Sequence, residues 1–269
     1  MKRTIYALLT LALVASAATS CKKYLELESK TNITNKWLYE TPEGLSRAVV
    51  ALYDLDRKIA KPSNDNNDCY VVQMLDYSTD LMVYRGGTAA ALARLDNLMP
   101  NNAVIEAFWN HHYNIIGKAN EIIFAAEGMD LEDPVVKRAW AEAKFFRGRA
   151  YFELYKRFER LYLNTVPTGV DNLQREFKPA SREDIFERIR IDLDAAAENL
   201  AWETPQGASA AQHGRVTKAT AKHVRAQFAM WENDWNTAID ACEEIFAHPE
   251  LFDFERHPEN VFLSGIELR

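Results

Sequence analysis

Cysteine is scarce in this sequence, which limits what can hold the chain together covalently. Only Cys21, Cys69 and Cys242 occur among 269 residues. Two cysteines could pair in an oxidising compartment, but so few do not make the disulfide framework of a small secreted domain. If Cys21 carries a lipid, only Cys69 and Cys242 remain. We expect both to be free thiols, and a disulfide between them is the alternative. The fold must then rest on an apolar core, for which the chain is long enough.

Motifs for catalysis and for cofactor binding are also missing. The sequence has no H-E-x-x-H, no G-x-S-x-G, no phosphate-binding glycine loop and no paired C-x-x-C. His111 and His112 are adjacent, so on a helix they point about 100° apart and make a poor pair of metal ligands. We interpret both as surface or packing residues. We therefore predict no enzyme activity, no cofactor and no metal site.

An excess of positive charge is absent as well. The formal net charge of −7 becomes −9 when the two positive charges of Lys2 and Arg3 are left out. Nucleic-acid binding needs a basic footprint for the phosphates, so this balance argues against a nucleic-acid partner. It also argues against a broad electrostatic contact with anionic lipid.

The N-terminus has the layout of a secretory signal. Lys2 and Arg3 precede an apolar stretch from Ile5 to Ala18, which is too short to span a bilayer of about 30 Å. The small residues that follow end in Ala18-Thr19-Ser20-Cys21, which resembles a lipobox. We therefore predict a signal peptide over residues 1–20 and a lipid attached to Cys21. An ordinary signal peptide with a chance cysteine near its end is the alternative.

The predicted anchor determines how the rest of the chain meets the membrane. A processed lipobox cysteine carries more than one acyl chain, and two or more chains anchor stably at about 0.8 kcal/mol per buried CH₂. No later stretch is apolar enough to span a bilayer. Residues 21–35 are polar and without periodicity, so we interpret them as a lipidated spacer that lifts residues 36–269 off the membrane.

Residues 36–269 show the three- and four-residue apolar spacing of α-helices. Cap residues and proline mark several starts, and Gly128 marks an end. The expected helices begin near Thr41-Pro42, Val104, Asp133-Pro134, Ser181-Arg182-Glu183-Asp184, Thr217 and Asp234. Lys61 to Asn102 lacks a clean helical period, and we interpret it as a long loop excursion, a kind of segment that is often functional.

The last two expected helices, near 217–231 and 234–247, have the residue pattern of tetratricopeptide hairpins. Small residues recur where the two helices would touch, and Trp235 would fill the gap to the next pair. A strict 34-residue period is absent. The prediction is therefore an all-α fold of irregular tetratricopeptide-like helical hairpins, with generic antiparallel helix packing as the alternative.

Charged and aromatic residues divide into two groups. Glu142, Lys144, Arg147 and Arg149 form one face of an expected helix, which we interpret as solvated or ion-paired. The aromatics that fit helical stripes are expected in the core: Trp109, Trp140, Phe146, Phe152 and Phe158. No helical stripe accounts for four others: Trp37, Tyr70, Tyr77 and Tyr84.

Aromatics displayed from loops can stack on the apolar faces of sugars, while amide and guanidinium groups bond the hydroxyls. Arg85, Asn101 and Asn102 could supply those bonds, and Tyr84 is the adjacent aromatic. These four residues are our candidates for ligand binding. A loop aromatic that instead fills the local core is the alternative.

Several segments together resemble the SusD/RagB family of Bacteroidetes outer-membrane nutrient-binding lipoproteins. They occur in the family's order and cover nearly all of the chain after the signal peptide. They are the lipobox with Lys22-Lys23-Tyr24-Leu25-Glu26-Leu27, Ser78-Thr79-Asp80 with Arg85-Gly86-Gly87, Phe108-Trp109 through Ala119-Asn120-Glu121-Ile122-Ile123, Glu142-Ala143-Lys144-Phe145-Phe146-Arg147 with Ala150-Tyr151-Phe152 and Val166-Pro167, Ser181-Arg182 with Asp192-Leu193, and Gly214-Arg215-Val216-Thr217-Lys218.

The resemblance implies a helical scaffold with tetratricopeptide-like units and a surface that binds glycan or another oligomeric nutrient. It implies a partner, a TonB-dependent outer-membrane barrel of the SusC-like kind, over which such a lipoprotein sits as a lid. It also implies an outer-membrane location, with Arg85, Asn101 and Asn102 on the ligand face. The competing hypothesis is a tetratricopeptide-type envelope scaffold that binds no small ligand.

Two departures from the family pattern bear on these expectations. Where sugar-binding members tend to place a tryptophan, this chain has Leu98-Met99, and Lys22 and Lys23 stand where surface-exposed members often carry acidic residues. Members are about twice as long as this chain. We therefore expect residues 36–269 to be the N-terminal part of a SusD-like helical domain whose C-terminal half is missing.

Overall fold

In the parts of the chain that the structure describes, every regular element is a helix. The computed structural model describes residues 35–60, 79–80, 90–95, 98–99, 101–169, 176, 178–203 and 214–252. The helices are α3 (Asn35–Glu40), α4 (Pro42–Ala60), α6 (Ala90–Arg94), α7 (Ala103–Glu127), α8 (Pro134–Tyr155), α9 (Arg182–Asn199), α10 (Lys218–Glu232) and α11 (Trp235–Phe246). The predicted all-α class is confirmed.

The chain divides into a short N-terminal unit, residues 1–37, and a larger unit, residues 38–269. The predicted signal peptide, Cys21 and nearly all of the spacer lie outside the described residues, as do Cys69, Tyr70 and Tyr77. Cys242 is a free thiol. None of the described helices combines the length and the apolar character needed to cross a bilayer.

Side-chain caps fix where the helices begin. The Thr41 hydroxyl accepts a hydrogen bond from the Gly44 amide at 3.0 Å. Each later cap likewise accepts from an amide of the first turn, which satisfies a donor that the helix itself leaves unpaired. These caps are Asn102, Asp133, Ser181, Thr217 and Asp234. The predicted helix starts are therefore confirmed.

The helix ends are less regular than the starts. Gly128 ends α7 as predicted, but in the right-handed region at φ −85°, so glycine's conformational freedom is not used there. The turn from α10 to α11 instead places Asn233 in the left-handed region at φ 60°. Helix α8 ends at Tyr155, so Phe158 lies beyond it, although its ring still packs on the core.

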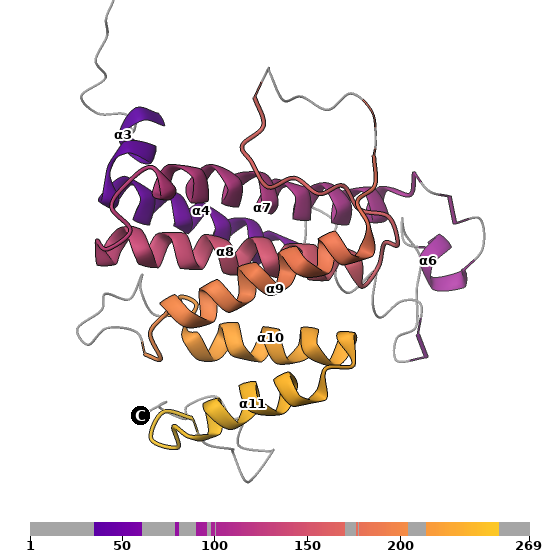
Figure 1. Cartoon of the computed structure of the whole chain (residues 1–269). Coiled ribbons are helices and arrows are strands. Elements are labelled where there is room, and N and C mark those ends of the chain that lie inside the picture. Colours follow the sequence, from indigo (N-terminus) through magenta and orange to yellow (C-terminus); the bar gives the residue numbers. More distant parts are fainter. Residues whose placement is uncertain are drawn as a thin grey trace, which may run out of the picture. The chain divides into compact units, whose positions relative to one another are not determined.

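From α7 to α11, successive helices run antiparallel and stack in chain order (Figure 1). Helices α7 and α8 pair, α4 packs against both, and α9, α10 and α11 each pack on the preceding helix. This succession agrees with the predicted tetratricopeptide-like arrangement. The long excursion between α4 and α7 is not all loop, because it contains the short helix α6.

The contact between α8 and α9 is close enough to require a glycine. A Cβ atom at Gly148 would lie 3.1 Å from the Asp192 Cβ and 3.2 Å from the Leu193 Cγ. An aromatic cluster then joins α8 and α9 to α10. In this cluster the Phe228 ring meets Phe152 at 5.2 Å and Phe186 at 5.1 Å, edge to face in both cases.

The last helix pair is buried on one side only. Ala226 and Ala229 of α10 and Ala238 and Ala241 of α11 are buried, as the small-residue pattern predicts. Trp235, predicted to fill the gap to a further pair, is 58% exposed. The described residues therefore leave an apolar face on this side of α11.

The adjacent histidines are packing residues, as predicted. The His111 Nε2 lies 2.5 Å from the Leu55 carbonyl oxygen, which joins α7 to α4. The His112 Nδ1 lies 2.8 Å from the Phe108 carbonyl oxygen within α7. Burial lowers the pKa of His112 to about 4. Among the described residues no group of histidine, cysteine or acidic side chains is arranged to hold a metal.

Acidification should destabilise the fold through His112. The folded chain holds this ring neutral, and the unfolded chain protonates it near pH 6.5, so its contribution is complete above pH 6.5 and is lost as the pH falls toward 4. The loss should reach about 3 kcal/mol. Urea unfolding from pH 4 to 7 should show a flatter pH dependence for His112→Gln than for the parent chain. A His111→Gln control that flattens the profile equally would contradict this assignment.

Candidate functional site

The predicted ligand residues are only partly within the described chain. Asn101 lies exposed in the turn before α7, and Asn102 is half-buried beside it. The Asn102 Oδ1 accepts a hydrogen bond from the Val104 amide at 3.0 Å, so this oxygen caps the helix. Tyr84 and Arg85 lie outside the described residues, and their predicted role stays a prediction.

The surface next to Asn101 is apolar. Leu98 is 40% exposed and Met99 is 61% exposed. These side chains stand at the position where sugar-binding members of the resembled family tend to carry a tryptophan. The described part of the predicted site is therefore an exposed amide beside two aliphatic side chains, at the start of α7.

The last turn of α8 lies near the start of α7, because the two helices are antiparallel. Arg157 follows α8 and covers the Phe108 ring of α7, 4.7 Å from its centroid. The Glu153 carboxylate pairs with Lys156 at 2.6 Å and with Arg157 at 2.7 Å. Burial raises the pKa of Glu153, but its hydrogen bonds and the positive charges of Lys156 and Arg157 outweigh burial and leave the pKa below its usual value.

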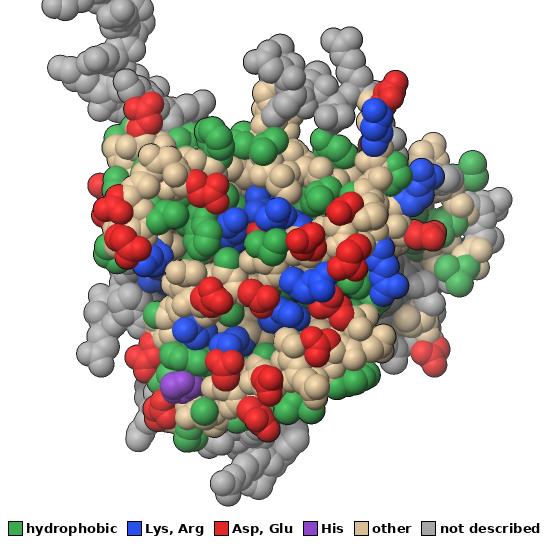
Figure 2. Space-filling model, viewed as in Figure 1, with side chains coloured by type: hydrophobic (Ala, Val, Ile, Leu, Met, Phe, Trp, Pro, Cys, Tyr) green, Lys and Arg blue, Asp and Glu red, His purple; other side chains and the backbone are tan. Residues whose placement is uncertain are grey.

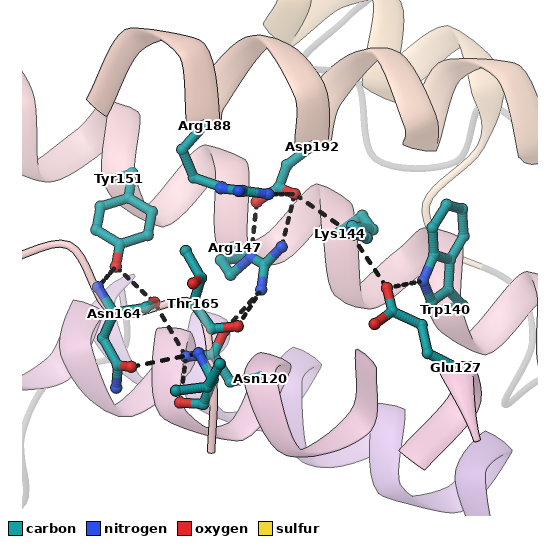
Figure 3. Close-up of polar contacts among 11 residues, drawn as sticks. Asn120, Glu127, Trp140, Lys144, Arg147, Tyr151, Asn164, Thr165, Arg188 and Asp192 are labelled. Atoms are coloured by element: carbon teal, nitrogen blue, oxygen red, sulfur yellow. Dashed lines mark hydrogen bonds and ion pairs between the residues drawn. The ribbon is translucent and has the colours of Figure 1, made fainter. Parts of the chain in front are cut away.

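A buried ion pair joins the middle of α8 to α9 and α7 (Figure 3). The Arg147 Nε and Nη2 donate to the two Asp192 oxygens at 2.7 and 2.8 Å, a bidentate arrangement. The Arg147 Nη1 donates to the Asn120 Oδ1 at 2.8 Å and to the Thr165 carbonyl oxygen at 3.3 Å. One guanidinium thus holds three helices and the segment that follows α8.

Two further cations surround Asp192. The Lys144 Nζ lies 3.7 Å from the Asp192 Oδ1 and 3.6 Å from the Glu127 Oε1, and the Arg188 Nη1 lies 3.6 Å from the same Asp192 oxygen. Burial lowers the pKa of Lys144, and the charge of Asp192 opposes this effect. The Trp140 indole N–H donates to Glu127 at 3.1 Å, so the network reaches the surface near the start of α8.

This arrangement decides between the two states expected for the charged face of α8, solvated or ion-paired. Glu142, Lys144 and Arg147 are buried, and only Arg149 is half-exposed, paired with Asp56 at 2.8 Å. Helices α4, α7, α9 and α10 all contact α8, so its polar face is covered as well as its apolar face. The face is ion-paired and not solvated. Figure 2 shows acidic and basic side chains intermingled over one face of the described helices, with neither sign covering a large area.

Glu142 organises a second network on the other side of α8. Its Oε2 accepts from the Tyr53 hydroxyl at 2.8 Å and from the Arg215 Nη2 at 3.0 Å, and its Oε1 accepts from the Arg138 Nε at 2.8 Å. The Tyr53 oxygen in turn accepts from the Val216 amide at 2.7 Å. Burial, and then the charge of Glu142, raise the pKa of Tyr53. The network fixes the segment before α10 against α4 and α8.

Residues 161–169, which we call the strap, run over α7 and α8 and are held by tyrosine hydroxyls. The Tyr113 hydroxyl donates to the Tyr162 carbonyl and accepts from the Tyr162 amide, both at 2.8 Å. The Tyr151 hydroxyl does the same with Asn164, at 2.8 and 2.7 Å. Burial raises the pKa of both tyrosines. Each hydroxyl thus bonds both polar groups of one strap residue.

Asn120 completes the attachment of the strap. Its Nδ2 donates to the carbonyl oxygens of Asn164 and Val166 at 3.0 and 3.2 Å, while its oxygen accepts from Arg147. No local pattern in the sequence predicts these pairings, although Asn120, Arg147 and Asp192 all fall in the segments that resemble the family. The networks hold backbone segments in fixed positions. They would therefore support a binding surface by positioning its residues and not by contacting the ligand.

Removing one strap contact should have a local effect. Tyr151→Phe leaves the Asn164 amide without its partner, while the Asn164 carbonyl keeps only the bond from Asn120, and the change should cost about 1–3 kcal/mol of stability. Amide hydrogen exchange should rise at Asn164 more than at Tyr162, and Tyr113→Phe should give the reverse pattern. Equal protection at both amides in both variants would contradict the account of the strap.

No family model matches the chain. Among curated proteins, SusD-like protein P25 of Formosa agariphila is 24% identical over 241 residues, which is 85% of this chain and 43% of that protein. A SusD-like protein of Bacteroides ovatus is also 24% identical, over 88% of this chain and 40% of its own length. The chain spans about two fifths of the length of these relatives.

Solved structures share the fold. Surface glycan-binding protein A of Bacteroides fluxus superposes with a TM-score of 0.64 at 21% identity, over 81% of this chain and 46% of that one. A laminarin-binding SusD-like protein gives a TM-score of 0.63 at 20% identity, over 76% and 43% of the two chains.

Proposed function

We propose that the chain is a SusD-like protein, a lipid-anchored binding protein that captures a glycan or another oligomeric nutrient. It passes this ligand to a TonB-dependent outer-membrane barrel of the SusC-like kind, and binding rather than catalysis is its role. The observation that carries the proposal is similarity to curated SusD-like proteins over more than four fifths of the chain. Glycan-binding and laminarin-binding proteins with the same fold support a saccharide ligand.

The described part of the proposed ligand face, Asn101, lies at the start of α7, and we propose that Tyr84 and Arg85 also contact the ligand. An exposed asparagine amide both donates and accepts, which suits the hydroxyl pairs of a sugar. Because the Asn102 oxygen caps α7, its contribution is to fix the turn that presents Asn101. Leu98 and Met99 offer aliphatic contact to a sugar ring in place of a stacking aromatic.

The proposed attachment has two parts. Lipid on Cys21 and the spacer over residues 21–35 tether the protein to the outer membrane at the cell surface. The barrel provides the second support, with the helical body resting over it as a lid. The buried networks around Arg147 and Glu142 support this role. A protein attached both by its lipid and by a barrel needs helices that keep their positions relative to one another.

Substitution of the ligand residues tests the site. Arg85→Ala with Asn101→Ala should lower the affinity for the bound glycan about tenfold or more, because each lost hydrogen bond costs about 1 kcal/mol and more when charged. Isothermal titration measures the affinity, and thermal unfolding should be unchanged. Asn114→Ala, an exposed asparagine further along α7, is the matched control. An unchanged affinity in the double variant would remove this site assignment.

Co-purification separates binding from scaffolding. The proposal expects a SusC-like barrel in detergent extracts of cells that express the full chain, together with glycan binding by the isolated chain. A barrel that co-purifies with a folded chain that binds no polysaccharide would favour the envelope scaffold instead.

A further inference from the structure

A pocket outside the Arg147 and Glu142 networks and the strap lies between the end of α8 and the second half of α10. Its volume is about 430 Å³, and its walls are Phe152, Lys156, Gln227, Met230 and Trp231. Pockets of this size with aromatic walls and a few polar groups are typical of small-ligand sites. Since α7 and α8 are antiparallel, the end of α8 and the start of α7 lie at one end of the helices. The pocket is thus at the same end as Asn101.

One wall of the pocket is an indole held in a fixed orientation. The Trp231 ring meets Phe152 edge to face, with centroids 6.1 Å apart and planes at 83°. Phe152 is itself locked, 1% exposed and packed against Phe228 at 5.2 Å. Trp231 nevertheless remains 46% exposed. A half-open, pre-oriented aromatic ring offers a flat surface at little cost in side-chain entropy.

The polar groups stand on either side of this ring. Gln227 lies one helical turn before Trp231 on α10, so its exposed amide is on the same face as the indole. The Gln227 Nε2 lies 3.2 Å from the His223 Nε2, which leaves the amide oxygen and the second N–H for a ligand. Lys156 approaches from α8, its Nζ 4.6 Å from the Phe152 ring centroid and 2.6 Å from the Glu153 Oε1. The pocket thus combines a flat ring with an amide that donates and accepts and an ammonium that donates.

The pairing of Lys156 with Glu153 affects which ligand charge the pocket favours. Because the Glu153 carboxylate lies 2.6 Å from this ammonium, it offsets part of the positive charge that the pocket would otherwise present to an acidic group. Arg157, the second partner of Glu153, covers Phe108 of α7 and is not among the pocket walls. A sugar ring fits this chemistry, since its C–H face stacks on the indole and its hydroxyls bond the amide and the ammonium.

We infer that the pocket between α8 and α10 is a second saccharide subsite that takes one ring of a neutral oligosaccharide. The inference goes beyond the proposed ligand face, because it uses none of Tyr84, Arg85 and Asn101. An apolar segment of a partner protein is the competing occupant. Such a segment would cover Gln227 and Lys156 without matching their hydrogen-bonding groups, which is unfavourable.

Fluorine NMR of the full chain labelled with 5-fluorotryptophan tests the subsite directly. The chain has six tryptophans, and Trp→Phe variants assign each signal. Laminarin, cellulose and starch oligosaccharides serve as neutral probes, and oligogalacturonate serves as the acidic probe. We expect the Trp231 signal to shift saturably with a neutral probe. The signal of Trp235, which is 58% exposed and outside the pocket, should stay in place.

Variants separate this subsite from the proposed ligand face. Gln227→Ala should raise the midpoint of the Trp231 shift about tenfold, and the Arg85→Ala, Asn101→Ala double variant should leave it within about twofold. Should neutral probes bind the chain by titration without moving the Trp231 signal, the subsite fails while the proposed function stands. No Trp231 shift with any neutral probe, equal shifts of Trp231 and Trp235, or a shift only when the barrel is added would each overturn the inference.

Discussion

Asp192→Ala is expected to lower the free energy of unfolding by about 3–5 kcal/mol. The carboxylate is fully buried, and the Arg147 guanidinium that it holds is 2% exposed. Without Asp192 that guanidinium stays inside the protein, with Lys144 and Arg188 close by and no carboxylate between them. An uncompensated buried charge is far more costly than a broken surface pair. Urea unfolding followed by circular dichroism measures the change.

Asp194 offers a matched control for this prediction. It lies two residues along the same helix and bonds the Arg225 Nε at 2.8 Å, but its side chain is 51% exposed. Asp194→Ala should cost less than about 1 kcal/mol. The double variant Asp192→Ala, Arg147→Met removes both charges and should recover part of the lost stability. Equal losses for Asp192→Ala and Asp194→Ala would contradict the account of the buried network.

Phe228→Ala is expected to cost about 3–5 kcal/mol as well, through loss of packing. The ring is fully buried and joins Phe152 of α8 to Phe186 of α9. Its removal leaves a cavity where three helices meet, and a backbone packed as closely as at Gly148 has little freedom to collapse into it. Thermal and urea unfolding should agree on the loss.

The control for Phe228 is the same substitution at a surface position. Phe124 of α7 is 67% exposed, so Phe124→Ala should change stability by no more than about 0.5 kcal/mol. Similar losses at the two positions would show that the aromatic cluster does not carry the packing between α8, α9 and α10.

The helix starts could be predicted because their signals are local. Asp133 before proline, Ser181 three residues before Asp184, and Thr217 each cap a helix with a side chain that reaches only two or three residues ahead. Asn102 gives the same local signal. Sequence reasoning assigned Asn102 to ligand contact, although the helix expected from Val104 also needed a cap.

The burial of charge on α8 could not be predicted from the sequence. Arg147 bonds Asn120 and Asp192, which are 27 and 45 residues away. Whether a charged face is solvated depends on how many helices surround it, and that is a property of the tertiary fold. The strap is a similar case, because the pairing of Tyr151 with Asn164 requires the chain to turn back over its own helix.

The candidate ligand site was located by resemblance more than by pattern. Asn101 is exposed at the start of α7, as a ligand contact requires. The sequence around it has no pattern of its own that would indicate a binding role. The pocket beside Trp231 cannot be predicted from the sequence, because the helical pattern there is typical of a core residue. Trp231 lies in a helix with a clear apolar face, so only its exposure in the folded chain separates it from a core residue.

Titration calorimetry of the folded full chain against a panel of polysaccharides tests the central claim most directly. We predict saturable binding to at least one glycan, weakened by Arg85→Ala with Asn101→Ala and unchanged by Asn114→Ala. A chain that unfolds cooperatively, and so is intact, but binds none of the panel would contradict glycan capture.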